Sequence, residues 1–216
     1  MNRGLFITFE GPDGAGKTTQ LHLLANRLAN MGIGYIVTRE PGGTAISDQI
    51  RALLLDPQNE QMCSKTEVLL YAASRAQLVE EVIRPALLSG RVVLCDRYVD
   101  ASIAYQGAGL GVNREQVTAV NAFATDSLAP DRTFLIDIDV TVGLSRVAQA
   151  RRSEFVGLDR IEQRATKYHD RVRTAFLTLA RQSPRRYAVL DGACPVGEIA
   201  SDIWALVQEN LPVKRS

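Results

Sequence analysis

Cysteine is scarce in this chain of 216 residues: Cys63, Cys95 and Cys194 are widely spaced and odd in number. Their spacing fits neither a zinc site nor a redox pair, so we expect free thiols. Long apolar runs are also lacking, since none approaches the length that crosses a membrane, and the N-terminal residues lack the apolar stretch and cleavage site of a signal peptide. These absences predict a cytoplasmic protein that does not span a membrane.

An excess of charge of one sign is absent too. The chain has 25 Lys and Arg residues against 24 Asp and Glu residues. This balance offers no argument for a nucleic-acid or membrane partner, so any anion site must be local. The length allows one substantial core and is too short for two comfortable domains, which predicts a single domain over 1–216.

Residues 11–18, G-P-D-G-A-G-K-T, fit the phosphate-loop pattern G-x-x-x-x-G-K-[ST]. The apolar run at 5–9 predicts a buried strand before it and 19–31 a helix after it, a context that a chance match lacks. Such a loop points backbone N–H groups at phosphates, while Lys17 reaches the β- and γ-phosphates and the Thr18 hydroxyl enters a Mg²⁺ shell. The expected ligand is a nucleoside triphosphate. The residues assigned to it are Gly11, Pro12, Asp13, Gly14, Ala15, Gly16, Lys17, Thr18 and Thr19.

Short apolar strands alternate with helical patterns along the rest of the chain. Successive strand–helix–strand units are right-handed and parallel, so the order predicts an α/β fold with a parallel sheet of about five strands. The strands are expected at 5–9, 35–38, 92–95, 133–139 and 187–190, and the helices at 19–31, about 44–55, about 66–89, 142–150 and 158–182, with a further one near the C-terminus.

Two charged residues follow the predicted strand at 92–95, at the sheet edge where open parallel sheets bind ligands. Asp96 could bind Mg²⁺, directly or through water, or could cap a helix. Arg97 would be costly to bury unpaired beside a phosphate loop, and a phosphate would pair it. Further along, the basic break 151–157 between two predicted helices is a candidate lid, the alternative being an ordinary solvated turn.

Tyr71 and Arg75 lie four residues apart and share one flank of the predicted helix at 66–89. The tyrosine ring could stack on a nucleobase, and the arginine guanidinium, one turn away, could donate hydrogen bonds to its carbonyl edge. A core tyrosine and a surface arginine fit the spacing equally well. The roles of Tyr105 and Gln106 are similarly open. His22 and His169 lie in predicted helices and are expected to be structural or solvated.

Five stretches, in order, resemble the thymidylate kinase family of the bacterial kind. They are F-E-G-P-D-G-A-G-K-T-T from Phe9, T-R-E-P-G-G from Thr38, Y-A-A-S-R from Tyr71, D-R-Y-V-D-A-S-I-A-Y-Q from Asp96 and L-D-R-I-E-Q from Leu158. D-R-Y followed by A-Y-Q is close to diagnostic. The resemblance implies a P-loop NTPase-type, three-layer α/β/α fold like that of nucleoside monophosphate kinases, with a short lid, and a homodimer. It also implies transfer of the γ-phosphoryl group of ATP to dTMP with Mg²⁺, in dTTP biosynthesis.

The resemblance further implies roles for individual residues of an acceptor site. Tyr71 would stack on thymine, Arg75 would donate to a base carbonyl, Arg97 would clamp the acceptor phosphate, Tyr105 would crowd the 2′ position of the sugar, and Asp13 would lie near the 3′-hydroxyl and the metal. The implied acceptor-binding residues are Glu40, Arg51, Tyr71, Arg75, Arg97, Ser102, Tyr105, Gln106 and Glu162.

In one branch of the family an arginine inside the phosphate loop supports the transferred group, and here that position is Gly14. The resemblance therefore assigns this charge to the lid, about 151–160, and places Arg146 along the adenine. The implied catalytic residues are Asp13, Lys17, Arg97, Arg151, Arg152 and Arg160, with Thr18 and Asp96 at the metal. Ala101 departs from the family's usual serine, so a hydrogen bond near the acceptor is absent or comes from Ser102.

Other functions stay open at this point. Another mononucleotide kinase on the same scaffold would need a different base reader. A P-loop switch or motor of the GTPase type would carry an N-K-x-D guanine reader, which the sequence lacks, and a non-catalytic nucleotide-binding scaffold would leave the lid arginines without a task. The apolar surface of the predicted helix at 66–89 fits either a second subunit or a wide core-facing side.

Overall fold

A computed structural model describes residues 3–153, 156–208 and 211. Five strands form one sheet in the order β2-β3-β1-β4-β5, and every neighbouring pair is parallel. The predicted five-stranded parallel sheet is confirmed, with strand ends shifted by one or two residues. The strands are β1 (Phe6–Glu10), β2 (Tyr35–Arg39), β3 (Val92–Asp96), β4 (Arg132–Asp137) and β5 (Tyr187–Asp191).

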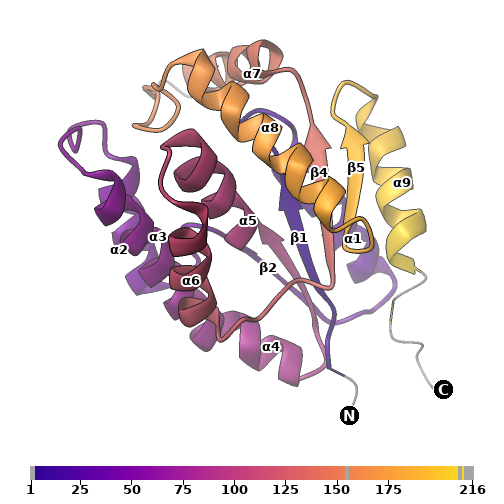
Figure 1. Ribbon diagram of the computed structural model, residues 1–216. Coiled ribbons are helices and arrows are strands. Elements are labelled where there is room, and N and C mark those ends of the chain that lie inside the picture. The colour runs from indigo at the N-terminus through magenta and orange to yellow at the C-terminus, as the bar shows by residue number, and fades with distance from the viewer. Residues whose placement is uncertain (1–2, 154–155, 209–210, 212–216) are drawn as a thin grey trace.

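Helices cover both faces of the sheet, which confirms the three-layer arrangement (Figure 1). On one face α1 and α9 pack against the strands through a cluster that includes Leu24 and Ile203. On the other face α3, η1 and α8 pack through Leu78, Ile83 and Phe176. The helical segments are α1 (Lys17–Asn30), α2 (Ala45–Leu55), α3 (Ser64–Leu78), η1 (Val79–Ile83), α4 (Arg84–Leu88), α5 (Val99–Ser102), η2 (Ile103–Gly109), α6 (Arg114–Thr125), α7 (Val140–Ser153), α8 (Thr166–Gln182) and α9 (Val196–Gln208). Within the described residues, none of these helices combines the length and apolar character needed to cross a bilayer.

The phosphate loop begins at the central strand. β1 lies between β3 and β4, and Phe9 pairs with Asp96 across the ladder. The loop and Asp96 therefore leave the sheet side by side at its carboxyl edge, where the strand order reverses and ligands of such sheets bind.

Gly14 and Gly143 bring the phosphate loop and the first turn of α7 into backbone contact. A Cβ added at Gly14, whose φ is 72°, would lie 2.1 Å from the Gly143 carbonyl oxygen, and one added at Gly143 would lie 2.4 Å from the Asp13 carbonyl oxygen. Neither position has room for a side chain, because each faces backbone that cannot rotate away. The loop is therefore seated directly on α7.

The predicted helix at 66–89 is wrong as one continuous α-helix. It begins at Ser64 and is divided into α3, the π-helical segment η1 and α4. Pro85 is the second residue of α4 and has no N–H to donate to the carbonyl four residues earlier, and a wider turn before a proline is a common way to absorb that loss.

The helices on either side of the predicted lid also have other bounds than the sequence predicts. α8 begins at Thr166 and not at 158, because the Asp159 carboxylate accepts the backbone N–H groups of Ile161 and Glu162 and folds this part into turns. α7 continues through Ser153, so Arg151 and Arg152 occupy its last turn, where basic side chains favour the helix dipole. Residues 154 and 155 of the predicted lid lie outside the described residues.

Three helical segments, α5, η2 and α6, were not predicted from the sequence. Asn113 accepts the Gln116 N–H at the start of α6, a capping signal that the sequence shows in Asn113 and Gln116. α5 and η2 are short and mostly buried, so they lack the polar face that makes a helix visible as a pattern.

Candidate active site

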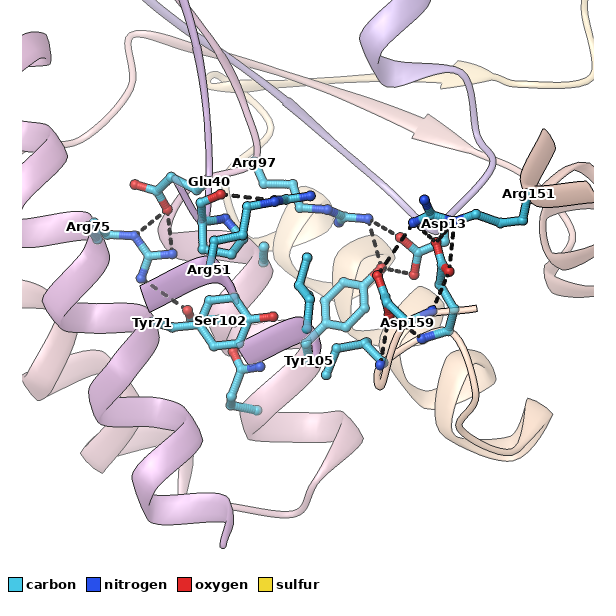
Figure 2. Close-up of a pocket in the computed structure, with 16 residues that line it drawn as sticks. Asp13, Glu40, Arg51, Tyr71, Arg75, Arg97, Ser102, Tyr105, Arg151 and Asp159 are labelled. Carbon is cyan, nitrogen blue, oxygen red and sulfur yellow. Dashed lines mark hydrogen bonds and ion pairs between the residues drawn. The ribbon is translucent and has the colours of Figure 1, made fainter. Parts of the chain in front are cut away.

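Two cavities meet at the carboxyl edge of the sheet. The first, here called the deep cavity, is drawn in Figure 2, and the second, the loop cavity, lies along the phosphate loop. The deep cavity is lined by Asp13, Glu40, Pro41, Arg51, Leu55, Tyr71, Arg75, Arg97, Ala101, Ser102, Tyr105, Gln106, Arg151, Asp159, Ile161 and Glu162. The loop cavity is lined by Asp13, Gly14, Lys17, Thr18, Leu21, His22, Val37, Thr38, Arg39, Glu40, Arg51, Asp96, Arg97, Val147 and Glu162. Asp13, Glu40, Arg51, Arg97 and Glu162 line both, so a ligand in one cavity would lie next to a ligand in the other.

Arg97, Asp13 and Tyr105 form a closed set of hydrogen bonds at this junction (Figure 2). Arg97 Nη2 donates to Asp13 Oδ1 at 2.6 Å and to the Tyr105 hydroxyl at 2.9 Å, and that hydroxyl donates to Asp13 Oδ2 at 2.8 Å. Arg97 Nη1 donates to the Gly11 carbonyl at 3.0 Å. Burial opposes ionisation of Asp13, yet the nearby Arg97 and Lys17 cations hold its pKa below the usual value. The set places a fixed carboxylate and a fixed guanidinium between the two cavities.

The backbone at Arg97 is in the left-handed region, with φ of 71°, which is uncommon for a residue with a Cβ. Two hydrogen bonds flank it: Arg97 N donates to the Phe9 carbonyl at 2.9 Å, and Tyr98 N donates to Glu10 Oε1 at 2.7 Å. Such conformations persist where the surroundings over-determine them. Glu10 is completely buried, and burial raises its pKa to about 8, with Asp100 adding to the rise.

Glu10→Gln is expected to reduce the dependence of stability on pH. The folded pKa of about 8 is above the reference value of 4.5. Between these values the folded state keeps a proton that the unfolded state releases, so this carboxyl makes the protein less stable as pH rises from about 5 to 8. Glutamine keeps the acceptor for Tyr98 N and does not ionise. We take the contribution of this carboxyl to the pH dependence of the unfolding free energy as about 2 kcal/mol. The fall in melting temperature between pH 5 and pH 8 should then be smaller by about 5 °C in the variant than in the wild type. An equal fall in both proteins by calorimetry would contradict this.

Lys17, Thr18 and Asp96 lie on the other side of the junction. Lys17 is buried, its Nζ donates to the Pro12 carbonyl at 2.7 Å, and burial together with the Arg97 charge lowers its pKa to about 8. The Thr18 hydroxyl donates to Asp96 Oδ2 at 2.5 Å. A hydroxyl and a carboxylate oxygen are the hard donors that Mg²⁺ takes beside a nucleotide, so these residues fit the ion. No cluster of three or more His, Cys, Asp or Glu suited to a metal occurs in the described residues.

Arg75 lies in the wall of the deep cavity and is only 1% exposed. Its Nε donates to Glu40 Oε2 at 2.6 Å, its Nη1 to the Ser102 hydroxyl at 3.0 Å and to Asn121 Oδ1, and its Nη2 to the Tyr98 carbonyl at 3.1 Å. The sequence-predicted Glu40, Arg75 and Ser102 are thus brought together. Glu40 serves chiefly to neutralise Arg75, and its other oxygen, Oε1, is buried without a hydrogen-bond partner.

Of the remaining predicted acceptor residues, Tyr71 and Gln106 line the deep cavity, and Arg51 donates to the Pro41 carbonyl at 2.9 Å. Arg146, predicted to lie along the adenine, reaches the carbonyls of Gly14 and Gly192 at 3.4 and 3.3 Å. The roles assigned to these residues stay predictions, although Tyr71, Gln106 and Arg51 line the deep cavity.

The three lid arginines occupy different surroundings. Arg151 points into the deep cavity and donates to Glu162 at 2.9 and 3.1 Å. Arg152 donates to the Ala148 carbonyl of its own helix and is exposed. Arg160 is buried and donates to the Leu54 carbonyl and to Glu67 at 2.8 Å each. Arg151 is the lid arginine that this arrangement brings to the site.

Sequence reasoning missed several residues that shape the site, namely Glu10, Glu67, Asn121, Asp159 and Ile161. They come from β1, α3, α6 and the turns before α8, and no local spacing marks them. His169, expected to be structural or solvated, is buried with Nδ1 at 4.0 Å from Asp13 Oδ2. The acid near it comes from the phosphate loop, far away in the sequence.

Comparison with known proteins matches residues 9–203 to the family model described as thymidylate kinase. A thymidylate kinase of Exiguobacterium sibiricum is 52% identical over 200 residues, covering 93% of this chain and 92% of that protein. One of Pelobacter propionicus is 51% identical over 210 residues, covering 96% and 95%. One of Deinococcus radiodurans is 49% identical over 210 residues, covering 97% and 99%.

Among solved structures, the crystal structure of thymidylate kinase from Ehrlichia chaffeensis superposes with a TM-score of 0.76 at 32% identity, covering 95% of this chain and 99% of that one. The family match, the relatives and the fold agree over nearly the whole length. The chain belongs to the thymidylate kinase family.

Proposed function

We propose that the protein transfers the γ-phosphoryl group of ATP to dTMP, giving dTDP and ADP, a step of dTTP synthesis. The observation that carries this proposal is the junction of the two cavities, where Arg97 and Asp13 line both. A nucleoside triphosphate on the phosphate loop and a monophosphate in the deep cavity would therefore meet at these two side chains. We also infer that the whole chain acts as one domain of this kind.

On the donor side, the phosphate loop and the start of α1 would hold the triphosphate. Lys17 supplies a positive charge that burial has already separated from water, and Thr18 and Asp96 would hold Mg²⁺. When bound, that ion neutralises charge on the phosphate oxygens. Arg146 would lie beside the base of the donor.

On the acceptor side, the deep cavity is lined by the Tyr71 ring, by the polar side chains of Arg75 and Ser102 and, at the junction with the loop cavity, by the Arg97 guanidinium. Tyr71 would stack on thymine, Arg75 and Ser102 would face the base, and Tyr105 would restrict the sugar. Phosphoryl transfer depends on positioning and charge neutralisation more than on covalent chemistry, and Arg97 and Arg151 would supply that charge near the acceptor phosphate.

An acceptor panel tests the proposal. The purified protein, ATP and Mg²⁺ are incubated with dTMP, dUMP, dCMP, dGMP or AMP, and ADP release is followed by a coupled assay. We expect dTMP to give the highest kcat/KM and ADP release without an acceptor to be at most about 1% of that rate, because hydrolysis lacks a positioned acceptor. Preference for another base, or equal ADP release without an acceptor, would contradict it.

We infer a homodimer that forms through α3 and α6. These helices pack on each other, and each leaves an apolar side chain exposed: Leu69 is 58% and Phe123 89% exposed. An apolar surface of this kind fits a subunit interface. Phe123→Lys is expected to weaken the dimer by at least tenfold in sedimentation equilibrium, since a buried lysine would be unpaired. Leu88→Lys, at an exposed apolar residue of α4, is the matched control. A monomeric wild-type protein at 100 μM would refute the inference.

We further propose that the protein acts in the cytoplasm. The cysteines Cys63, Cys95 and Cys194 are all free thiols, which suits a reducing compartment. Fractionation of cells that express a tagged chain would test this.

A further inference from the structure

Glu67 of α3 is a buried carboxylate to which the site described above assigns no role. It lies one turn before Tyr71, and its side chain is 1% exposed. Its oxygens accept three side chains from two separate parts of the chain: Gln106 Nε2 donates to Oε1 at 2.9 Å, and Arg160 Nη2 and Arg164 Nη2 donate to Oε2 at 2.8 and 2.6 Å. Glu67 therefore joins η2, in the wall of the deep cavity, to the segment that follows α7.

The two arginines keep this carboxylate ionised. Burial disfavours the charged form, but hydrogen bonds and charge from Arg164, with further bonds from Gln106 and Arg160, lower the pKa of Glu67. Each arginine is itself fixed. Arg160 Nε donates to the Leu54 carbonyl at 2.8 Å, and the Arg164 guanidinium lies 4.6 Å from the centre of the Tyr168 ring and donates to its hydroxyl.

An ionised carboxylate can accept hydrogen bonds and cannot donate them. Gln106, which is buried and lines the deep cavity, must therefore turn its NH₂ group toward Glu67, and its amide oxygen, on the other side of the amide, is the acceptor left for a ligand. If the NH₂ group and the oxygen exchanged places, two oxygens would face each other in a buried setting, which costs the full desolvation penalty of both groups. Glu67 thus fixes which end of the amide faces the cavity.

The orientation of the Gln106 amide can distinguish thymine from cytosine, because the two bases differ at ring atom N3. Ring atom N3 of thymine carries a hydrogen and donates, whereas N3 of neutral cytosine has a lone pair and accepts. An amide oxygen aimed at N3 would accept from thymine and repel cytosine, and a site built to pair with a polar group rejects a ligand that cannot pair.

We propose that Glu67 is a specificity-determining positioning residue, which selects thymine over cytosine by holding the Gln106 amide with its oxygen toward the base. This inference rests on the proposed function, because it requires the acceptor base to lie in the deep cavity. The class of ligand selected is a pyrimidine nucleotide with a hydrogen on N3.

The test uses the full chain and compares dTMP with dCMP. Glutamine at position 67 can donate as well as accept, so in Glu67→Gln the Gln106 amide is free to turn. We expect the ratio of kcat/KM for dTMP to kcat/KM for dCMP to fall at least tenfold in Glu67→Gln, with dCMP gaining relative to dTMP. A merely structural role would lower both rates together and leave the ratio unchanged. Glu81→Gln, at an exposed glutamate that pairs with Gln77 in the same helical run, is the matched control and should keep the wild-type ratio.

A second pair of variants guards against misfolding of Glu67→Gln. Gln106→Leu removes the amide, so it should lower the ratio as well, and adding Glu67→Gln to it should change the ratio by less than twofold, since the two residues act through one contact. A wild-type ratio in folded Glu67→Gln, or in Gln106→Leu if the former does not fold, overturns the inference alone. A wild-type protein that does not phosphorylate dTMP overturns both this inference and the proposed function.

Discussion

Arg97→Ala is expected to lower kcat/KM for dTMP phosphorylation by about 1,000-fold. The side chain makes three hydrogen bonds, to Gly11, Asp13 and Tyr105, and two of them meet at the boundary of the cavities. These bonds hold the guanidinium where we propose that it contacts the acceptor phosphate. Losing two charge-assisted contacts to that phosphate, of about 2 kcal/mol each, removes about 4 kcal/mol of transition-state stabilisation, or three orders of magnitude in rate. The variant also removes one of the two cations that lower the pKa of Asp13, so this pKa should rise. A coupled ADP-release assay at saturating ATP measures the effect.

Arg97→Lys separates charge from geometry. An ammonium is a point charge and cannot bridge Gly11, Asp13 and Tyr105 as the fork of a guanidinium does, so we expect a loss of at least about 100-fold. Arg181→Ala, at an exposed arginine in the last turn of α8, is the control and should stay within twofold of wild type. If Arg97→Ala retained more than a tenth of wild-type activity, the acceptor phosphate would have to bind elsewhere.

Lys17→Met is expected to lower kcat by about 1,000-fold while the melting temperature stays the same or rises. The loss follows from removing a fixed positive charge that faces the phosphates, a contribution of about 3–4 kcal/mol in comparable sites. Stability should not suffer, because methionine fills similar space and removes an ammonium whose pKa burial has lowered to about 8. Single-turnover kinetics and calorimetry on the same preparation measure the two effects.

Binding of dTMP provides the control for Lys17→Met. Lys17 lines the loop cavity and not the deep cavity, so the affinity for dTMP alone, measured by isothermal titration calorimetry, should change by less than about threefold. A variant that lost dTMP binding and catalysis together would show that the two cavities are not separate sites for donor and acceptor.

The parallel sheet could be predicted because its signals are local. Each strand is a short apolar run, and the phosphate loop marks the central one with a pattern that requires a strand before it and a helix after it. The π-helical segment before Pro85 and the start of α8 at Thr166 could not be predicted from periodicity. The first depends on one missing N–H, and the second on a carboxylate that competes for the backbone.

The residues of the candidate site also fall into those that a local sequence signal marks and those that only tertiary contacts reveal. Lys17, Thr18, Asp96 and Arg97 were found because they follow strand ends or a fixed motif, and strand ends of a parallel sheet meet at one edge. Glu67 and Glu10 were missed, since what makes them important is their partners, and Gln106, Arg164 and Tyr98 lie 39 to 97 residues away along the chain. A charged residue on a helix reads as solvated until tertiary packing buries it.

The contact between Gly14 and Gly143 limits how α7 can move. Because backbone lies against backbone there, the N-terminal end of α7 has no room to slide, so a tilt of the helix would turn about this contact and would move Arg151 at its C-terminal end the most. Arg151 lies eight residues from Gly143, about 12 Å along the axis, so a tilt of about 10° would carry its Cα about 2 Å. A tilt of α7 about this contact would therefore move Arg151 at the deep cavity while the phosphate loop stays in place.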